Sequence, residues 1–164
     1  MNDNFADFGD NPSGPTKPPT GNPHGKRQGE FVELAFMYKA ASFGFGIAKP
    51  WGESGQYDFI LDNGKVLWRI QVKSTTNFDR YAYKLGTYWK SVARHHRPYT
   101  SDQIDFLAGY VIPENTWYIL PVSAFTPRRV VIVYPHRSTD NGQFEQYREA
   151  WHLLKSTQSS SSAI

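Results

Sequence analysis

The chain contains no cysteine, which excludes a disulfide framework and any metal site built on thiolates. It also has no apolar run of membrane-spanning length, and its polar, acidic N-terminus has no apolar segment typical of a secretory signal. We therefore predict a cytoplasmic protein with no membrane partner. The 164 residues suit one domain with a real core, because 39% of them are apolar and 16% are aromatic.

Several catalytic signatures are missing as well. The five histidines lack the spacing of metal ligands, and the adjacent His95 and His96 would point apart on any regular element. Gly44-Phe45-Gly46 does not match a phosphate-binding glycine loop, and there is neither a P-loop nor a serine-nucleophile elbow. These absences argue against a histidine zinc site, a nucleotide-binding loop and a hydrolase triad. The net charge of +3 does not by itself identify a nucleic-acid partner.

Composition divides the chain into three parts. Residues 1–26 are rich in proline and glycine and lack hydrophobic periodicity, and residues 156–164 are rich in serine. Both segments are predicted to be disordered tails, because they cannot bury enough apolar surface to offset the entropy of ordering. Residues 27–155 between them are predicted to form one folded domain.

Hydrophobic periodicity predicts helices at both ends of this domain and strands between them. The first helix is expected over residues 28–42, with Phe31, Leu34, Ala35 and Tyr38 packing on a sheet. The second is expected over 144–155, with an apolar stripe of Phe144, Tyr147, Trp151 and Leu154. Strands are expected over residues 45–49, 104–112, 116–120 and 130–134. The order indicates an α+β (mixed α/β) fold.

The stretch from Tyr57 to Lys73 reads as two strands joined at Asn63-Gly64, the dipeptide that most readily forms a two-residue type I′ turn. That turn would place Asp58 opposite Arg69. Because side chains alternate faces along a strand, Asp58, Arg69, Gln71 and Lys73 fall on one face and an apolar layer falls on the other. The polar face is either a solvated surface with an Asp58–Arg69 ion pair or a functional cluster, and the hairpin alone leaves both open.

A glutamate on the first helix supports the functional interpretation. Glu33 flanks the apolar stripe, so it can reach the face that carries Asp58 and Gln71. Two carboxylates, an amide oxygen and the backbone carbonyl of Val72 would then converge. This oxygen-only set suits Mg²⁺, with Mn²⁺ as a substitute. Such a metal lowers the pKa of a bound water, and Lys73 beside it could deprotonate that water or stabilise developing charge.

Asp58, followed after twelve residues by Gln71-Val72-Lys73 and preceded by a helix bearing Glu33, resembles the PD-(D/E)XK nuclease superfamily. The likeness is greatest to the branch with group I intron homing endonucleases and Holliday-junction-resolvase-like proteins. It implies a restriction-endonuclease-like α-β-β-β core, a central mixed sheet flanked by helices, and Mg²⁺-dependent hydrolysis of DNA phosphodiesters by a metal-activated water. It further implies that Glu33, Asp58, Gln71 and Val72 hold the metal and that Glu33, Asp58, Gln71 and Lys73 are catalytic.

Two residues depart from the superfamily pattern. Tyr57 stands in place of the proline, and Gln71 stands where an aspartate or glutamate is usual. A neutral amide removes one negative charge, which weakens metal binding, although the homing-endonuclease branch has a QxK variant. The alternative is therefore a catalytically inactive DNA-binding module on the same fold.

Basic and aromatic residues alternate between Arg80 and Arg97, where there is no acid. This composition predicts contacts with a DNA backbone; its alternative is a solvated loop whose aromatic residues belong to the core. Hydroxyl groups directly after Lys73 could also donate to a phosphate. Glu30 and Gln56 are secondary candidates for the cleft. The predicted DNA-binding residues are Ser74, Thr75, Thr76, Arg80, Tyr81, Tyr83, Lys84, Lys90, Arg94 and Arg97.

The expected partner is duplex or branched DNA. One active site cuts one strand at a time, and a chain of this size covers little DNA. We therefore expect a homo-oligomer, a dimer or larger.

Overall fold

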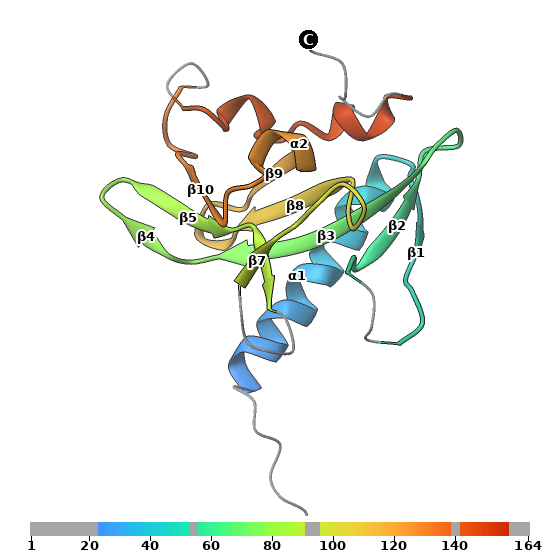
Figure 1. Ribbon diagram of the computed structural model, residues 1–164, viewed down its shortest axis with the longest axis horizontal. Coiled ribbons are helices and arrows are strands. Elements are labelled where there is room, and N and C mark those ends of the chain that lie inside the picture. Colours follow the sequence, from blue (N-terminus) through green and yellow to red (C-terminus); the bar gives the residue numbers. More distant parts are fainter. Residues whose placement is uncertain (1–22, 53–55, 91–95, 139–141, 158–164) are drawn as a thin grey trace, which may run out of the picture.

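The computed structural model describes residues 23–52, 56–90, 96–138 and 142–157. A five-stranded sheet lies between a long helix on one face and a smaller three-stranded sheet on the other (Figure 1). Within these residues no helix is both long and apolar enough to cross a membrane. The elements are α1 (Pro23–Ser42), β1 (Gly46–Ala48), β2 (Phe59–Asp62), β3 (Leu67–Thr75), β4 (Phe78–Asp79), β5 (Ala82–Gly86), β6 (Tyr88–Lys90), β7 (His96–Pro98), β8 (Phe106–Val111), η1 (Ile112–Glu114), β9 (Thr116–Pro121), α2 (Val122–Phe125), β10 (Val130–Val133), η3 (Glu145–Tyr147) and η4 (Trp151–Lys155).

The central sheet has the strand order β1-β2-β3-β8-β9. Strands β3 and β8 are parallel, and the other neighbouring pairs are antiparallel. The connection between the two parallel strands carries β4 to β7. The predicted α-β-β-β core and mixed central sheet are confirmed, and three of the four predicted strand regions became β1, β8 and β9 of this sheet.

The β2–β3 hairpin has the predicted faces but a different register. Leu61 pairs with Trp68, two residues further along than a type I′ turn would give. The cause is Asn63, whose side-chain oxygen accepts hydrogen bonds from the N–H groups of Lys65 and Val66 and so closes a four-residue loop. A shift of two residues preserves the faces, because side chains alternate with a period of two. The predicted division into a polar and an apolar face therefore holds.

Helix α1 begins at Pro23, so residues 23–26 are helical and do not belong to the predicted tail. Its last turn ends at Gly44, whose φ of +84° suits glycine, with hydrogen bonds from Gly44 to Ala41 and from Phe45 to Ala40. The predicted packing face is wrong. The helix buries Val32, Phe36 and Ala40, while Phe31, Leu34 and Tyr38 lie exposed and Ala35 packs only at the border of the core.

The opposite face of the central sheet is covered by β5, β10 and α2. Leu85 of β5 approaches β8 so closely that a Cβ at Gly109 would lie 2.2 Å from its side chain. A larger residue there would have to displace the fully buried Leu85 side chain, so glycine permits this close approach of the two sheets. Strand β10 is the predicted fourth strand region, but it belongs to the smaller sheet.

The predicted helix over residues 144–155 is instead two short 3₁₀ helices, η3 and η4. Between them Glu149 has a φ of +49°, and its backbone N–H and side-chain carboxylate hold the carbonyl and N–H of Trp117. These bonds to β9 replace the helical ones and break the helix. Phe144, Trp151 and Leu154 are nevertheless buried, as their spacing predicted.

Candidate active site

Asp58 lies directly before β2, where β3 continues past the end of its neighbour. Its Oδ2 atom accepts hydrogen bonds from the Gln71 side-chain amide at 2.6 Å and from the Val72 backbone N–H at 2.7 Å. The Gln71 nitrogen lies 3.2 Å from the Val72 carbonyl oxygen as well. The structure thus brings three of the predicted site residues into direct contact.

The simple ion-pair interpretation of this face is wrong. Arg69 pairs with Asp105, through its Nε atom at 3.1 Å and an Nη atom at 2.8 Å, because the shifted register places Arg69 opposite Ile60. Arg69 therefore does not compensate the charge of Asp58. Among the described residues this half-buried carboxylate accepts hydrogen bonds from an amide and a backbone N–H, an arrangement that is costly for stability and typical of a functional position.

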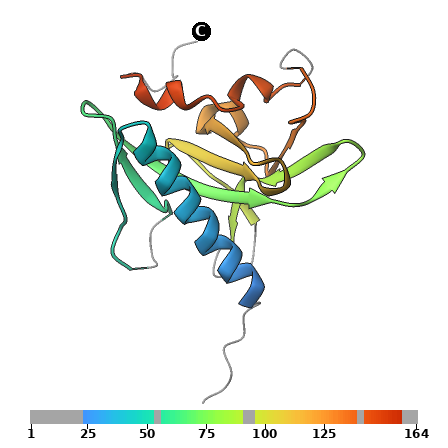
Figure 2. The same ribbon diagram turned by 180° about the vertical axis from the view of Figure 1, so that it is seen from behind.

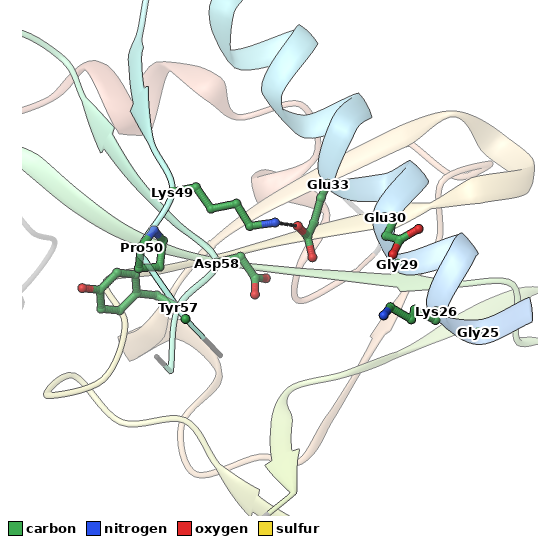
Figure 3. Close-up of a pocket in the computed structure, with 10 residues that line it drawn as sticks. Gly25, Lys26, Gly29, Glu30, Glu33, Lys49, Pro50, Tyr57 and Asp58 are labelled. Carbon is green, nitrogen blue, oxygen red and sulfur yellow. Dashed lines mark hydrogen bonds and ion pairs between the residues drawn. The ribbon is translucent and has the colours of Figure 1, made fainter. Parts of the chain in front are cut away.

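Glu33 reaches the same place from α1. The prediction that Glu33 lies across the polar face is wrong, because the helix covers the apolar face of the sheet. Glu33 approaches Asp58 from that side, at the end of β2. Glu33, Asp58 and the unpredicted Lys49 point toward one another in a cleft of about 370 Å³ (Figure 3). Lys49 donates to Glu33 at 2.6 Å. Glu30 lines this cleft one helical turn from Glu33.

Lys73 lies on the other face of β3 from α1. It lines a second cleft of about 400 Å³ together with Ser74, Tyr88 and Trp89. Its ammonium group lies 5.9 Å from the ring centre of the buried Tyr99, so the aromatic face stabilises and positions the charge. Lys73 is still close enough to Asp58 for its charge to lower the pKa of that carboxyl group.

The pKa of Asp58 lies above its ordinary value of 3.8. Burial is the main cause, and the charge of Glu33 adds to it. The Val72 N–H, the charge of Lys73 and the Gln71 amide act in the opposite direction. The cleft thus concentrates negative charge that the surrounding residues only partly compensate.

This raised pKa makes Asp58 a stability liability above acidic pH. From pH 3.8 up to the raised value, the unfolded chain has lost the proton that the folded chain still holds, so the free energy of unfolding falls as pH rises. We expect Asp58→Asn to raise Tm at pH 7 in the absence of metal. The gain should vanish well below pH 3.8, where wild-type Asp58 is protonated in both states. Calorimetric melting of both proteins across this range measures it, and a lower Tm for the variant at pH 7 would contradict the expectation.

The residue types fit a divalent cation. Among the described residues no three histidines, aspartates or glutamates form a cluster, but the carboxylates of Glu33 and Asp58 and the carbonyl of Val72 are the oxygen ligands that Mg²⁺ prefers. The partly compensated charge on Asp58 favours a cation too. Gln71 differs from expectation, because its amide nitrogen and not its oxygen faces Asp58 and the Val72 carbonyl.

Comparison with known proteins agrees with this geometry. The family model of PD-(D/E)XK endonucleases matches residues 23–154. This chain belongs to that family. Among solved structures, it is similar to the bacterial homing endonuclease I-Ssp6803I with a TM-score of 0.66 and 25% sequence identity, over 79% of this chain and 90% of the other. The curated proteins contain no match. The predicted superfamily and the restriction-endonuclease-like fold are confirmed.

The predicted DNA-contacting residues divide into three groups in this family member. The exposed residues are Thr76, Arg80, Tyr81, Lys84 and Arg97, of which Lys84 is paired with Asp79. Ser74 is half-buried, and its hydroxyl accepts a hydrogen bond from Gln28. Arg94 and the side chain of Lys90 lie outside the described residues. Thr75 and Tyr83 are buried, which makes the prediction wrong for both.

Both buried residues have partners inside the protein. Thr75 donates to the Lys84 carbonyl at 2.7 Å, and the Tyr83 hydroxyl donates to Glu114 at 2.7 Å. The secondary candidate Gln56 is half-buried, and its side-chain oxygen is buried without a hydrogen bond among the described residues. Thr75 and Tyr83 are therefore not arranged to meet a DNA backbone, and Gln56 is not among the residues that line the cleft of Asp58.

Two residues of this endonuclease fold were missed from the sequence. Lys49 could have been found, because the strand before it pairs with β2, and Ala48 opposite Ile60 brings the next residues beside Asp58. Tyr99 has no such signal, since it follows β7 and reaches Lys73 only through the packing of a non-local loop.

Proposed function

We propose that this protein is a Mg²⁺-dependent DNA endonuclease that hydrolyses phosphodiester bonds by attack of a metal-activated water. The observation that supports it best is the contact of Asp58 with Gln71 and Val72, beside a cleft that Asp58 shares with Glu33. These residues lie at the positions that resemble the metal-binding motif of the superfamily. The surplus of negative charge in the cleft is what a divalent cation would neutralise.

Each residue has a distinct role in this proposal. Glu33, Asp58 and the Val72 carbonyl would hold the metal, which supplies a more acidic water and compensates the charge of the phosphate. Lys73, held against Tyr99, would stabilise the charge that develops on the phosphate oxygens or accept a proton from the attacking water. Lys49 orients Glu33 by its hydrogen bond and supplies positive charge while no metal is bound.

The exposed basic residues suit the DNA backbone. Arg80 and Tyr81 lie exposed at the tip of the β4–β5 hairpin, and Arg97 lies exposed on β7. Phosphate contacts of this kind weaken steeply with ionic strength. Binding to DNA that falls with rising salt is therefore part of the proposal.

Incubation with supercoiled plasmid and with branched DNA tests the proposed activity. We expect nicked or cut products with Mg²⁺ or Mn²⁺ and none after chelation. The substrate that is cut faster distinguishes duplex from branched DNA as the target. Intact DNA at every metal concentration would refute the activity.

A catalytically inactive DNA-binding module is the second candidate. It is favoured by the Gln71 amide nitrogen, which lies between Asp58 and the Val72 carbonyl and so bridges two of the oxygens proposed to hold metal. Metal coordination by the Gln71 oxygen needs the amide turned end for end. An amide that stays in place would leave the fold able to bind DNA but not to cut it.

Calorimetric titration with Mn²⁺ separates the two candidates. We expect wild type to bind, and Gln71→Glu to bind roughly 10-fold or more tightly, because the new carboxylate adds a negative ligand. Gln146→Glu, at an exposed residue of η3 beside β9, is a matched control and should leave the affinity unchanged. If neither wild type nor Gln71→Glu binds at millimolar Mn²⁺, the enzyme proposal fails and the binding module stands.

A further inference from the structure

The outer face of α1 is apolar, and no other described part of the chain covers it. Phe31 is 56% exposed, Leu34 65% and Tyr38 79%, and Met37 lies beside them. Seen from behind, α1 crosses the sheet with no other described element over its outer side (Figure 2). We call these four residues the α1 stripe.

The fold gives no reason for the α1 stripe. The side of α1 that faces the sheet is already complete, because Val32, Phe36 and Ala40 are almost fully buried there. Large side chains present roughly 150–250 Å² each, so these fractions leave on the order of 500 Å² of exposed surface. An apolar patch of that size is at the upper end of what a monomer exposes, and such patches are often functional.

We infer that the α1 stripe is the interface between two copies of this chain, packed with their α1 helices antiparallel about a two-fold axis near Leu34. The face is self-complementary about this residue. Phe31 and Met37 lie three positions to either side of Leu34, and Glu30 and Tyr38 lie four positions to either side. Antiparallel pairing therefore sets Phe31 of each copy against Met37 of the other.

The polar residues on this face suit the same arrangement. Glu30 of one copy would face Tyr38 of the other, where the carboxylate can accept from the phenol. Arg27, seven positions before Leu34, would face the last turn of the other helix, whose free carbonyls attract a cation. The one arginine and one glutamate cancel, so this face does not suit a phosphate backbone.

The area is sufficient for a specific contact. Two stripes would bury about 1,000 Å² in all, which is the lower bound for a stable interface, and the neighbouring side chains Arg27, Glu30 and Ala41 add to it. Aromatic residues, methionine and arginine are also the types enriched at such interfaces. A hydrophobic contact on one long helix face needs no rearrangement of the fold.

This pairing also orients the two clefts. A two-fold axis that relates antiparallel helices lying side by side is perpendicular to both, so it keeps Glu33 of each copy on the same side of the helix pair. If the proposed function holds, one DNA duplex lying on that side meets both active sites. The interface itself does not depend on that function.

Single-cysteine variants give the test, because the chain has no cysteine of its own. Leu34→Cys should form a covalent dimer on mild oxidation, while Lys65→Cys, exposed at the hairpin turn, should not. Wild type should sediment as a dimer of the 18.8 kDa chain. Leu34→Glu should weaken self-association roughly 100-fold or more, since it places a charge at the centre of the interface. Lys65→Glu is its control.

Three results would overturn the inference. The first is that wild type sediments as a monomer, which is also the result expected if residues 1–22 and not a second copy cover the α1 stripe. Leu34→Glu could sediment as the same dimer as wild type, which would place the interface elsewhere. If Leu34→Glu loses its fold by circular dichroism, the cross-linking result decides, and no covalent dimer from Leu34→Cys overturns it. None of these results depends on whether the protein cuts DNA.

Discussion

Replacing Asp58 with asparagine is expected to lower Mg²⁺-dependent nicking by on the order of 1,000-fold or more. The carboxylate is half-buried, and it shares the cleft with Glu33 and accepts hydrogen bonds from Gln71 and Val72. An amide there removes the negative charge that would hold the metal, and losses of this size follow from removing a single stabilising group in an enclosed site. Initial rates on supercoiled plasmid measure the loss.

The fold should survive this substitution. The asparagine oxygen can still accept the Val72 N–H, and removing a buried charge favours folding at pH 7, so Tm should not fall. Asp62→Asn is the matched control, because Asp62 lies at the other end of the same strand and an asparagine oxygen can still accept the Gly64 N–H. Equal activity of Asp58→Asn and wild type would remove Asp58 from the site.

Replacing Lys73 with methionine is expected to lower nicking by about 10²–10⁴-fold, the range typical of a group that transfers a proton or stabilises charge in the transition state. Methionine keeps the unbranched apolar stem that packs near Tyr99 but lacks the ammonium group. The two substitutions should differ in metal binding. Lys73→Met should bind Mn²⁺ at least as tightly as wild type, because a nearby positive charge has been removed, whereas Asp58→Asn should bind it poorly.

Lys65→Met is the control for this variant, since Lys65 is an exposed lysine at the turn of the same hairpin. It should cut plasmid at the wild-type rate. Arginine at position 73 adds a further distinction, because it keeps the charge but not the ability to release a proton near neutral pH. Substantial activity in Lys73→Arg would show that Lys73 acts by stabilising charge. If Lys73→Met cuts as fast as wild type, Lys73 neither stabilises charge nor transfers a proton.

The faces of the β2–β3 hairpin could be predicted from sequence although the register could not. Alternation fixes which residues share a face, and a loop longer by two residues leaves that assignment unchanged. The register depended on Asn63, whose side chain both closes the loop and binds the carbonyls of Leu154 and Ser156. Those partners lie far along the chain, so no local pattern could indicate them.

Helix α1 shows the opposite case, in which the pattern gave the element but the wrong face. Two stripes on the helix are apolar, and periodicity does not say which one meets the sheet. The small side chain of Ala40, beside Val32 and Phe36, allows α1 to lie close to β2 and β3. The stripe of larger side chains remains exposed to solvent. Glu33 lies between the two stripes, so its position at the border of the cleft survived this error.

The remaining differences come from contacts over long distances in sequence. Thr75 was predicted to meet DNA from its place after Lys73, and Tyr83 from the composition of the Arg80–Arg97 stretch, but β5 folds back on the central sheet and buries both. Tyr99 became a neighbour of Lys73 through the same packing. Motif residues close together in sequence could thus be placed in advance, while their neighbours from the β4–β7 connection could not.

The bonds from Asn63 to the C-terminal segment set the time at which the site can be completed during synthesis. Asn63 and Trp68 are separated from Leu154 by 91 and 86 residues, so the hairpin next to Asp58 lacks these anchors until Leu154 has left the ribosome. At a synthesis rate of about 5–20 residues per second, that delay is roughly 4–18 s. Contacts between residues so far apart in the sequence also slow folding. A nascent or prematurely terminated chain would therefore carry every motif residue of a nuclease without a finished active site.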